Sequence, residues 1–565
     1  MLQRVRATAS MLKRTLRNRL GLTVPASTAR KVDGLSKAEQ AQLAGPGRRV
    51  VTDGRRTVVA DANDAVSPWT ACAELSARVE SILLRQQVEH WTVHQRGSRV
   101  SHWAVRQQDF VGLFAELAVE LESECYYLRS EALGPEPRLI EECLEALGSE
   151  PMSVQVFRYV RDPFGDVRSD HVACRISGWE AGSRGTLRAP NRAGVVHEID
   201  DVRPIATTRV LRWDGTTEPR LAALAVPDST EIDFAIDAVY LWVDGSDPEW
   251  RDRRDGSRRR LLHQGRDESP EALADFRYRD RGELRASLRS LEFYAPWFRQ
   301  VYLVTDSQRP AWLDPASSRI QVVDHRDIFE DPHALPSFNS QAIGSQLHRI
   351  QGLAEHYLVM NDDIMFNRPA SPYDFFTPEG LMKVVKSRSR MPLVDTSKLT
   401  PLESARRNSA SLIERDHGRR VTQLFAHVPI PQTREVANEV ATRYRPEIAQ
   451  TVRHPFRSPD DVEVNSWLHL NVALLTGRAV VSRQRFAYFD IGDDSARRRM
   501  RRRGEFADAL TVCVNDSGPA DDEEVSRWYS DWLRRAFPVA AAHELPPERG
   551  AVASPDPFPN VYEPS

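Results

Sequence analysis

The chain has 565 residues, of which 41% are hydrophobic, and its formal net charge at pH 7 is only −3. This length predicts two or three domains with separate hydrophobic cores, and the near-neutral charge provides no overall field that would attract nucleic acid. No run of eighteen consecutive apolar residues is present, and the first 24 residues lack the apolar core of a signal peptide. We therefore expect a cytoplasmic protein.

The cysteines are scattered, odd in number and never arranged as CxxC. This pattern argues against a disulfide framework and a zinc site, and favours buried thiols in a reducing compartment. The five cysteines are Cys72, Cys125, Cys143, Cys174 and Cys513.

Residues 1–49 form a basic N-terminal segment, whose first 31 residues hold eight Lys or Arg and no acidic residue. Leu12, Leu16 and Leu20 fall on one helical face, which would suit a helix lying on the inner face of an anionic membrane. A solubilising tail has the same composition. The sequence leaves both interpretations open.

Residues 50–230 predict an accessory α+β domain. Helical patterns at 71–87 and 110–128 precede strand-like segments at 154–162 and 171–179, with turn residues between them. We find no chemical constellation in this region, and a boundary is expected near Pro227.

Between residues 231 and 540, four apolar runs each end on an acidic residue. The runs are AVYLWVD (238–244), QVYLVTD (300–306), IQVVD (320–324) and HYLVMNDD (356–363). Continuous apolar runs of this kind predict strands of a parallel sheet covered on both faces, and ligands bind beyond the carboxyl ends of such strands. The alternative is that each Asp merely opens a turn.

The segments between these runs complete a βαβ alternation. Residues 282–298 predict an amphipathic helix closed by Pro296, residues 337–357 a second helix, and the charged stretch 251–260 a loop. The pattern predicts an α/β, Rossmann-like (GT-A-like) nucleotide-sugar-binding catalytic domain. Neither GxGxxG nor a P-loop is present, which argues against dinucleotide and P-loop chemistry. We therefore favour a nucleotide-sugar enzyme in which a divalent metal neutralises the diphosphate. The expected metal is Mg²⁺ or Mn²⁺, held by Asp362 and Asp363.

Several long blocks in order resemble the Stealth family. They are IDAVYLWVDGSDPEW, RDRGELRASLRSLEFYAPWFRQVYLVTDSQRPAWLD, VVDHRDIFEDPHALPSFNSQAIGSQLHRIQGLAEHYLVMNDDIMF, HVPIP and HPFRSPDDV. The resemblance covers residues 236–475, and a weaker likeness continues through TVCVNDS to RRAFP. Members of this family are hexose-1-phosphate transferases, among them bacterial capsule and exopolysaccharide polymerases.

The resemblance implies an exopolysaccharide phosphotransferase. Such an enzyme would transfer a hexose-1-phosphate from a UDP-sugar to an acceptor hydroxyl of a glycan and release UMP. Two other classes remain open: a conventional glycosyltransferase that releases UDP, and a non-catalytic sugar-nucleotide-binding protein of polysaccharide assembly.

The resemblance also implies three catalytic residues, Asp363, His427 and Arg457. Asp363 is a metal ligand or the base, and His427 is the general base or a phosphate contact. The planar fork of Arg457 suits two phosphate oxygens, whereas an ordinary salt bridge is the alternative. The following Ser458-Pro459 predicts a helix start that could also face an anion.

Substrate-binding residues are implied at the remaining motif positions. Arg285 and Arg289 either reach the diphosphate or are solvated helix charges, and Asn339 is expected to cap a helix while touching substrate. The full set is Asp244, Gly245, Asp247, Glu283, Arg285, Arg289, Asn339, Ser340, Asn515 and Asp516.

Three further features complete the predictions. Gly344 stands where many family members carry Glu, which removes a carboxylate. The basic run 497–503 suits a membrane surface, an anionic acceptor or a solvated loop. Residues 541–565 are predicted to be a Pro-rich C-terminal tail.

Overall fold

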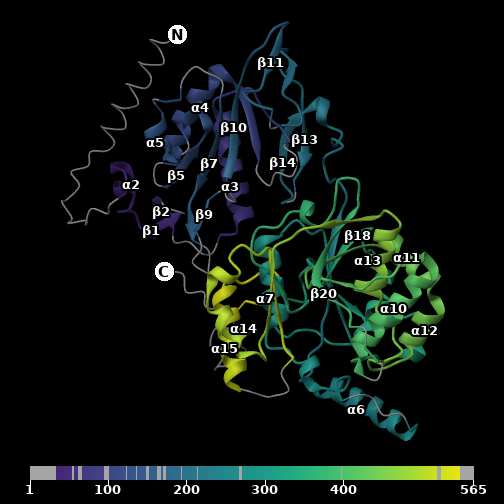
Figure 1. The fold of residues 1–565 in the computed structure, drawn as a ribbon. Coiled ribbons are helices and arrows are strands. Elements are labelled where there is room, and N and C mark those ends of the chain that lie inside the picture. Colours follow the sequence, from purple (N-terminus) through teal and green to yellow (C-terminus); the bar gives the residue numbers. More distant parts are fainter. Residues whose placement is uncertain are drawn as a thin grey trace. The chain divides into compact units, whose positions relative to one another are not determined.

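The computed structural model describes residues 34–546, apart from 54–55, 62–65, 95–100, 122–123, 135, 145, 148–151, 162–166, 170–172, 193, 213, 266–269, 393, 396–397 and 518–522. The predictions for residues 1–33 and 547–565 lie outside the described residues. The chain divides into an N-terminal unit, Met1–Glu231, and a C-terminal unit, Ile232–Ser565 (Figure 1). Each unit has its own hydrophobic core.

The N-terminal unit is a mixed α+β structure. Its larger sheet has the path β13-β14-β3-β4-β10-β7-β5-β6, and a smaller sheet has the order β1-β2-β8-β9. The core lies between the larger sheet and helices α3 and α4. The elements are α2 (Lys37–Gln42), β1 (Arg48–Asp53), β2 (Arg56–Asp61), α3 (Pro68–Arg85), β3 (His90–Thr92), β4 (His102–Arg106), α4 (Gln107–Glu120), β5 (Tyr126–Arg129), β6 (Arg138–Leu139), α5 (Ile140–Cys143), β7 (Ser153–Arg158), β8 (Val160–Arg161), β9 (Val167–Arg168), β10 (Ala173–Ala181), β11 (Thr186–Arg188), β12 (Glu198–Asp200), β13 (Thr207–Leu211) and β14 (Thr217–Leu221).

The N-terminal unit begins earlier than predicted. Residues 34–49 were assigned to the basic segment, but Glu39 in α2 is only 1% exposed and accepts a hydrogen bond from the Tyr127 hydroxyl at 3.1 Å. These residues therefore belong to the folded unit.

The C-terminal unit is built on a five-stranded sheet of order β17-β16-β15-β18-β22. The first four strands are parallel and β22 is antiparallel. The elements are β15 (Ile236–Leu241), α6 (Pro248–His263), α7 (Glu283–Tyr294), β16 (Val301–Thr305), β17 (Ile320–Asp324), α8 (His325–Ile328), α9 (Ser340–Gly344), β18 (His356–Asn361), β19 (Ile364–Phe366), β20 (Met382–Arg390), α10 (Pro401–His417), β21 (Gln423–Phe425), β22 (Ile430–Thr433), α11 (Arg434–Arg443), α12 (Arg445–Val452), a π-helix (Val464–Leu468), α13 (His469–Leu475), β23 (Ala479–Ser482), β24 (Phe486–Asp490), α14 (Asp494–Met500), β25 (Thr511–Asn515) and α15 (Glu523–Ala536).

The four apolar runs are parallel strands, as predicted; β15, β16 and β18 are largely buried on both faces of the sheet, whereas the edge strand β17 is only partly buried. The order β17-β16-β15-β18 is that of a Rossmann-like half, which confirms the α/β fold class. The narrower GT-A-like description stays a prediction. Two small sheets, β19-β25-β24 and β21-β20-β23, extend the unit beyond β18.

Two element predictions are wrong. The charged stretch 251–260 is part of helix α6, which projects from the C-terminal unit (Figure 1). Asp247 caps this helix, Pro248 occupies its first turn, and Arg is a good helix former. The long helix predicted over 337–357 is instead the short α9 and a 3₁₀ turn at Leu347–Arg349.

Helix α7 is buried on almost every side, so its arginines are not solvated helix charges. Arg285 is 2% and Arg289 5% exposed. The Glu544 carboxylate accepts hydrogen bonds of 2.7 Å from Arg285 Nε and Arg289 Nη2. The prediction that these arginines reach a diphosphate is therefore corrected: they anchor the C-terminal segment. The tail also starts later than residue 541, because residues 541–546 pack on the unit.

Replacing Glu544 with Gln should destabilise the protein strongly. The change leaves two buried guanidinium groups without their carboxylate, and breaking a buried ion pair costs about 3 kcal/mol or more. Urea denaturation measures the loss. Glu330→Gln is the matched control, because the Glu330 side chain is 54% exposed where it pairs with Arg349 and should contribute less than about 1 kcal/mol. Equal small losses in the two variants would contradict the assignment.

Candidate functional site

The site is expected where the strand order of the sheet reverses. The chain runs from β15 outward to β16 and β17 and then returns to β18 on the other side of β15. Ligands of open α/β sheets bind at such a switch point, beyond the carboxyl ends of the strands. The loops after β15 and β18 meet at this edge, and they carry Asp244, Asp362 and Asp363.

Three of the four strand-end acids have local structural partners. Asp324 caps α8, Asp306 accepts a 3.0 Å hydrogen bond from Arg253 Nε, and Asp244 accepts from the Ser246 backbone N–H at 2.8 Å. The bonds of Asp324 and Asp244 fit the turn-forming alternative, whereas Asp306 is held by an ion pair. The acidic pair after β18 is different, because no such cap or ion pair holds it within the described chain.

The loop after β15 is a rigid turn. Gln308 accepts from the Asp244 backbone N–H at 3.0 Å and donates to Asp247 Oδ2 at 2.9 Å. The Gly245 N–H donates to the Tyr278 carbonyl at 2.8 Å, and a Cβ on Gly245 would lie 2.2 Å from that oxygen. Gly245 therefore permits a close backbone approach, as predicted, although the approaching backbone is the protein's own.

A group of carboxylates gathers beside β18, and we call it the acidic cluster: Asp280, Glu283, Asp362 and Asp363. Burial and the charges of Asp280 and Asp362 raise the pKa of Glu283 well above its ordinary value. The pKa of Asp362 is also raised well above its ordinary value, by burial and by the charges of Asp363 and Asp280. Trp242 Nε1 donates to Asp280 at 2.8 Å, which fixes one member in place. Carboxylates held together against their own repulsion suit a cation.

Asp363 has one satisfied and one unsatisfied oxygen. The Cys513 thiol donates to Oδ2 at 3.4 Å, whereas Oδ1 is buried and has no hydrogen-bond partner within the described part of the chain. Burial raises the pKa of Asp363 to about 6. The buried Tyr529 hydroxyl is likewise unsatisfied among these residues, and burial, together with the charges of Glu283 and Asp363, raises its pKa well above the ordinary value. A buried polar atom without a partner requires an explanation, such as a bound water molecule, a bound ion or a catalytic role.

The residues present fit Mg²⁺ or Mn²⁺ in chemistry, since such ions prefer carboxylate oxygens and a buried, unsatisfied oxygen is available on Asp363. Within the described ranges, however, no three His, Cys, Asp or Glu side chains already converge as a ligand set. Substrate oxygens would therefore have to complete the coordination, as is usual for Mg²⁺ bound with a diphosphate.

His427 lies in the loop between β21 and β22, and its side chain is exposed. Desolvation by the surrounding protein lowers the pKa of His427, and the charge of Arg406 lowers it further. The ring packs against Tyr488 with centroids 5.2 Å apart. No described residue hydrogen-bonds to either ring nitrogen, so a neutral imidazole is available to accept a proton.

Arg457 lies in the loop after α12. Its Nη2 donates to Ser340 Oγ at 2.8 Å, at the start of α9. Burial and the nearby charge of Arg277 lower the pKa of Arg457 to about 10. Among the described residues Arg457 forms no ion pair, so the ordinary salt bridge is not seen. Two neighbouring guanidinium groups, of which Arg457 has no ion-pair partner among the described residues, suit an anion.

Hydrogen bonds to the buried Asp461 hold the loop that carries Arg457. Asp461 is 1% exposed and accepts from Asn339 Nδ2 and the Ser458 N–H, each at 2.8 Å. Asn339 caps α9, as predicted, but its side chain is fully buried and bonded to protein, so the predicted substrate contact is corrected. The predicted helix start at Ser458 is also wrong, because a turn follows and the helix begins at Val464.

Asn515 and Asp516 end β25 near the same edge. Asn515 Nδ2 donates to Asp490 Oδ2 at 3.0 Å, and Asp516 pairs with Arg281. Since Arg281 directly precedes the capping residue of α7, this pair ties β25 to the acidic cluster. Contact of either residue with substrate stays a prediction.

Gly344 is the last residue of α9, and a Cβ there would lie 2.2 Å from Asn465 Nδ2. The position where many family members carry Glu is therefore tightly packed in this chain. We predict that Gly344→Ala lowers the free energy of unfolding by about 1–3 kcal/mol through overpacking. In an Asn465→Ala background the same change should cost less than about 1 kcal/mol. Thermal unfolding of the four proteins measures this coupling, and additive effects would contradict it.

Sequence reasoning missed the groups that support these side chains. Cys513 was treated as a buried apolar residue, and Tyr488, Asp280 and Asp461 were not singled out. Asp280 could have been suspected, since it lies inside the quoted block RDRGELR, two residues before Gly282. Nothing in the sequence brings Tyr488 to His427.

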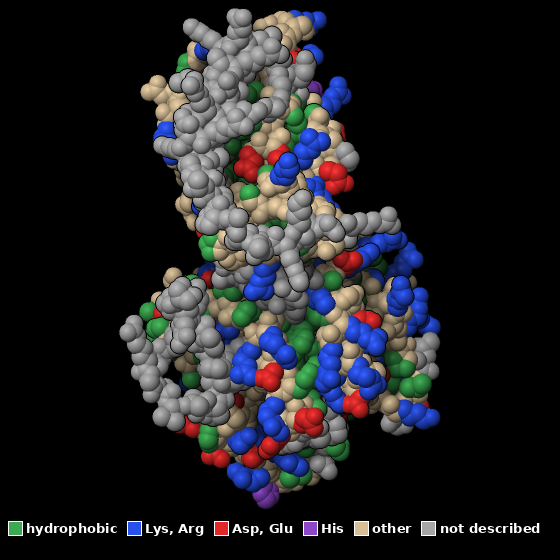
Figure 2. Space-filling view, turned by 90° about the vertical axis from the view of Figure 1, so that its left-hand side faces the viewer, with side chains coloured by type: hydrophobic (Ala, Val, Ile, Leu, Met, Phe, Trp, Pro, Cys, Tyr) green, Lys and Arg blue, Asp and Glu red, His purple; other side chains and the backbone are tan. Residues whose placement is uncertain are grey.

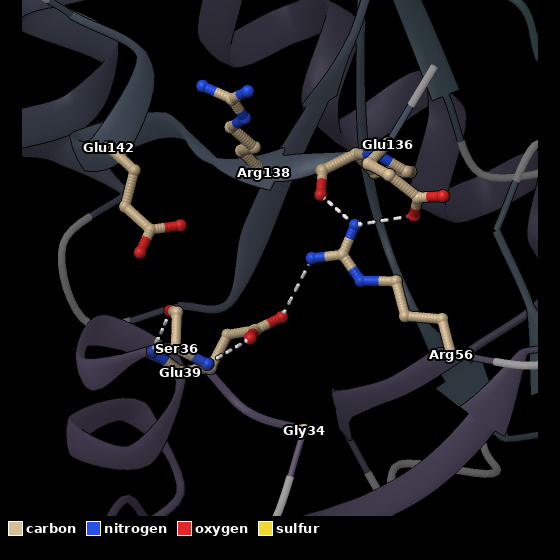
Figure 3. A pocket seen from close by; sticks show the side chains of 8 residues that line it. Gly34, Ser36, Glu39, Arg56, Glu136, Arg138 and Glu142 are labelled. Carbon is tan, nitrogen blue, oxygen red and sulfur yellow. Dashed lines mark hydrogen bonds and ion pairs between the residues drawn. The ribbon is translucent and has the colours of Figure 1, made fainter. Parts of the chain in front are cut away.

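A cavity of about 540 Å³ lies in the N-terminal unit and contains none of the predicted site residues (Figure 3). Ionic side chains line it, and Arg56 donates to Glu136 at 3.3 Å and pairs with Glu39 at 3.3 Å. Its charges are thus partly neutralised internally. The chemistry-bearing residues all belong to the C-terminal unit.

The basic run 497–503 is not a loop but helix α14 and the turn after it. Arg498, Arg501 and Arg502 are exposed, and Arg501 lies 5.7 Å from the Trp528 ring centroid. Lys and Arg side chains, interspersed with acidic ones, gather over the C-terminal unit in Figure 2. Of the helices that the structure describes, none combines the length and apolar character needed to cross a membrane.

Comparisons with known proteins match the sequence blocks quoted above, in the same order. Profiles of Stealth protein conserved regions 1, 2 and 3 match residues 234–261, 277–384 and 426–473. An exopolysaccharide phosphotransferase of Streptomyces coelicolor is 33% identical over 575 residues, which cover 93% of both chains. Another from that organism is 38% identical over 384 residues, 66% of this chain and 64% of the relative.

More distant likenesses extend the comparison. The Mycobacterium tuberculosis exopolysaccharide phosphotransferase is 28% identical over 496 residues, 87% of this chain and 91% of its own. The chain spans 64% and 43% of the length of two Streptomyces coelicolor relatives. A galactosyltransferase crystal structure with donor and acceptor sugar analogues matches with a TM-score of 0.26 and 11% identity, over 53% of this chain and 95% of that one. No conclusion rests on this last likeness.

Proposed function

Because the chain belongs to the Stealth family, we propose that it is an exopolysaccharide phosphotransferase. It transfers a hexose-1-phosphate from a UDP-sugar to a hydroxyl group of a glycan and releases UMP. The names of the relatives, which cover nearly the whole chain, support the reaction class. The UDP-sugar donor and the release of UMP are what the family resemblance implies, and they are part of our proposal.

The observation that carries the proposal is that three separate chemical groups, the acidic cluster after β18, Arg457 and His427, suit three different tasks. The acidic cluster, with its unsatisfied Asp363 oxygen, suits a divalent cation, while Arg457 offers a guanidinium group without a carboxylate partner among the described residues. A neutral, exposed imidazole, His427, is a separate group that can accept a proton. Phosphoryl transfer needs these three components: cationic stabilisation, a base and positioning.

In this proposal His427 accepts the proton of the acceptor hydroxyl as its oxygen attacks the β-phosphorus of the donor. The bond from that phosphorus to the UMP oxygen breaks, and the sugar keeps its anomeric bond. Arg457 binds the phosphoryl oxygens on which negative charge develops. A cation held by Asp362 and Asp363 would, when bound, neutralise the diphosphate.

The proposal is tested by the nucleotide that the enzyme releases. Purified protein is incubated with Mg²⁺ or Mn²⁺, an oligosaccharide acceptor and a panel of UDP-sugars, and the products are separated by chromatography. We expect UMP from one donor of the panel. Release of UDP would instead establish a glycosyltransferase, and donor binding without turnover would indicate a non-catalytic protein.

A further inference from the structure

One row of residues crosses the small sheet beside the acidic cluster. Ile364 of β19 pairs with Cys513 of β25, and Cys513 pairs with Tyr488 of β24. Asp363, which precedes Ile364, accepts from the Cys513 thiol at 3.4 Å. Since neighbouring strands lie about 4.8 Å apart, Tyr488 is roughly 10 Å from β19, which begins directly after Asp363.

Tyr488 extends this row to His427. Its side chain is 39% exposed, whereas its neighbours in β24, Ala487 and Phe489, are 8% and 1% exposed. The Tyr488 and His427 rings are 5.2 Å apart and inclined at 52°. An exposed aromatic ring therefore lies beside the proposed base and within two strand spacings of the acidic cluster.

From this arrangement we propose that Tyr488 forms the acceptor subsite, where the C–H face of a pyranose ring packs on the phenol ring and one sugar hydroxyl meets His427. The inference rests on the proposed function, which places the donor diphosphate at the acidic cluster and Arg457. The group that contacts His427 is then the acceptor. Sugar rings combine an apolar face with hydroxyl groups, and sites for such ligands pair an aromatic surface with a few placed polar groups.

Steady-state kinetics with the UDP-sugar and acceptor active in the panel separate binding from positioning. Tyr488→Ala should raise the acceptor KM about 10-fold, which corresponds to about 1.4 kcal/mol of lost contact, and Tyr488→Phe should keep the wild-type value. A residue that merely oriented His427 would lower kcat instead and leave the acceptor KM unchanged. That result, or an equal rise in the donor KM, would overturn the subsite.

Saturation-transfer NMR with a set of methyl hexopyranosides tests binding independently of the reaction. We expect saturation of the sugar C–H protons by the wild type and by Tyr488→Phe, and its loss in Tyr488→Ala. Val481→Ala, which alters another exposed apolar strand residue, should behave as the wild type. Equal signals in Tyr488→Ala, or no signal with any pyranoside, would overturn the inference. If the wild type binds a pyranoside but releases UDP, the proposed function fails while the subsite stands.

Discussion

Asp363→Asn should lower kcat at least about 10³-fold while leaving the fold intact or more stable. The carboxylate lies at the switch point of the sheet with one oxygen buried and unsatisfied in the described chain. Removing a general base or a metal ligand of a phosphoryl-transfer site costs factors of this size. The amide keeps the shape of the side chain but removes a buried charge that has no ion-pair partner among the described residues, so folding should gain rather than lose.

The measurement combines initial rates with thermal unfolding in EDTA. Asp324→Ala provides the matched control, because this acid also ends a strand but caps α8. The control should lose about 1 kcal/mol of unfolding free energy and keep its kcat. If Asp363→Asn instead lost stability and kept activity, Asp363 would be a structural residue like Asp324.

His427→Ala should lower kcat by about 10²–10⁴-fold and change the donor KM little, because a general base acts on the acceptor hydroxyl. Desolvation lowers the pKa of His427, so the imidazole is neutral near pH 7 and becomes protonated only as the pH falls below its ordinary value of 6.5. The wild-type kcat should therefore decline on the acid side of pH 6.5. Since the side chain is exposed, added imidazole should restore part of the activity of the variant.

The control for this variant is His333→Ala, an exposed histidine in the 3₁₀ turn Pro332–Ala334, which should retain full activity. A pH–rate profile with and without imidazole distinguishes the outcomes. If His427→Ala raised the donor KM and imidazole had no effect, His427 would be a phosphate contact instead of the base.

The sheet could be predicted because its signal is local. A strand buried on both faces is mostly apolar, and β15, β16 and β18 follow that rule, while the edge strand β17 is apolar except at Gln321 and Asp324. Helix α6 was not predicted because its sequence is highly charged and shows no apolar stripe. The N-cap Asp247 and the first-turn Pro248 are nevertheless typical signals of a helix start. The helix predicted over 337–357 failed because its apolar spacing reflects packing of several short segments.

The site itself was only partly predictable. An Asp at a strand end has the same sequence signature whether it caps a helix, as Asp324 does, or has an oxygen without a partner among the described residues, as Asp363 does. Partners distant in sequence decide between these roles. Glu544 accepts hydrogen bonds from Arg285 and Arg289, which lie about 255 residues earlier in the sequence. The Cys513 thiol donates to Asp363, which lies 150 residues earlier. No spacing rule finds such contacts.

The proposed function requires that the bond between the sugar and its phosphate survives the reaction. A UDP-sugar labelled with ¹⁸O at the oxygen between the anomeric carbon and the β-phosphorus tests this directly, with mass spectrometry of both products. We predict that the label is retained in the glycan product, within a phosphodiester that joins sugar and acceptor. Label found in the released nucleotide would show attack at the anomeric carbon and would contradict sugar-phosphate transfer.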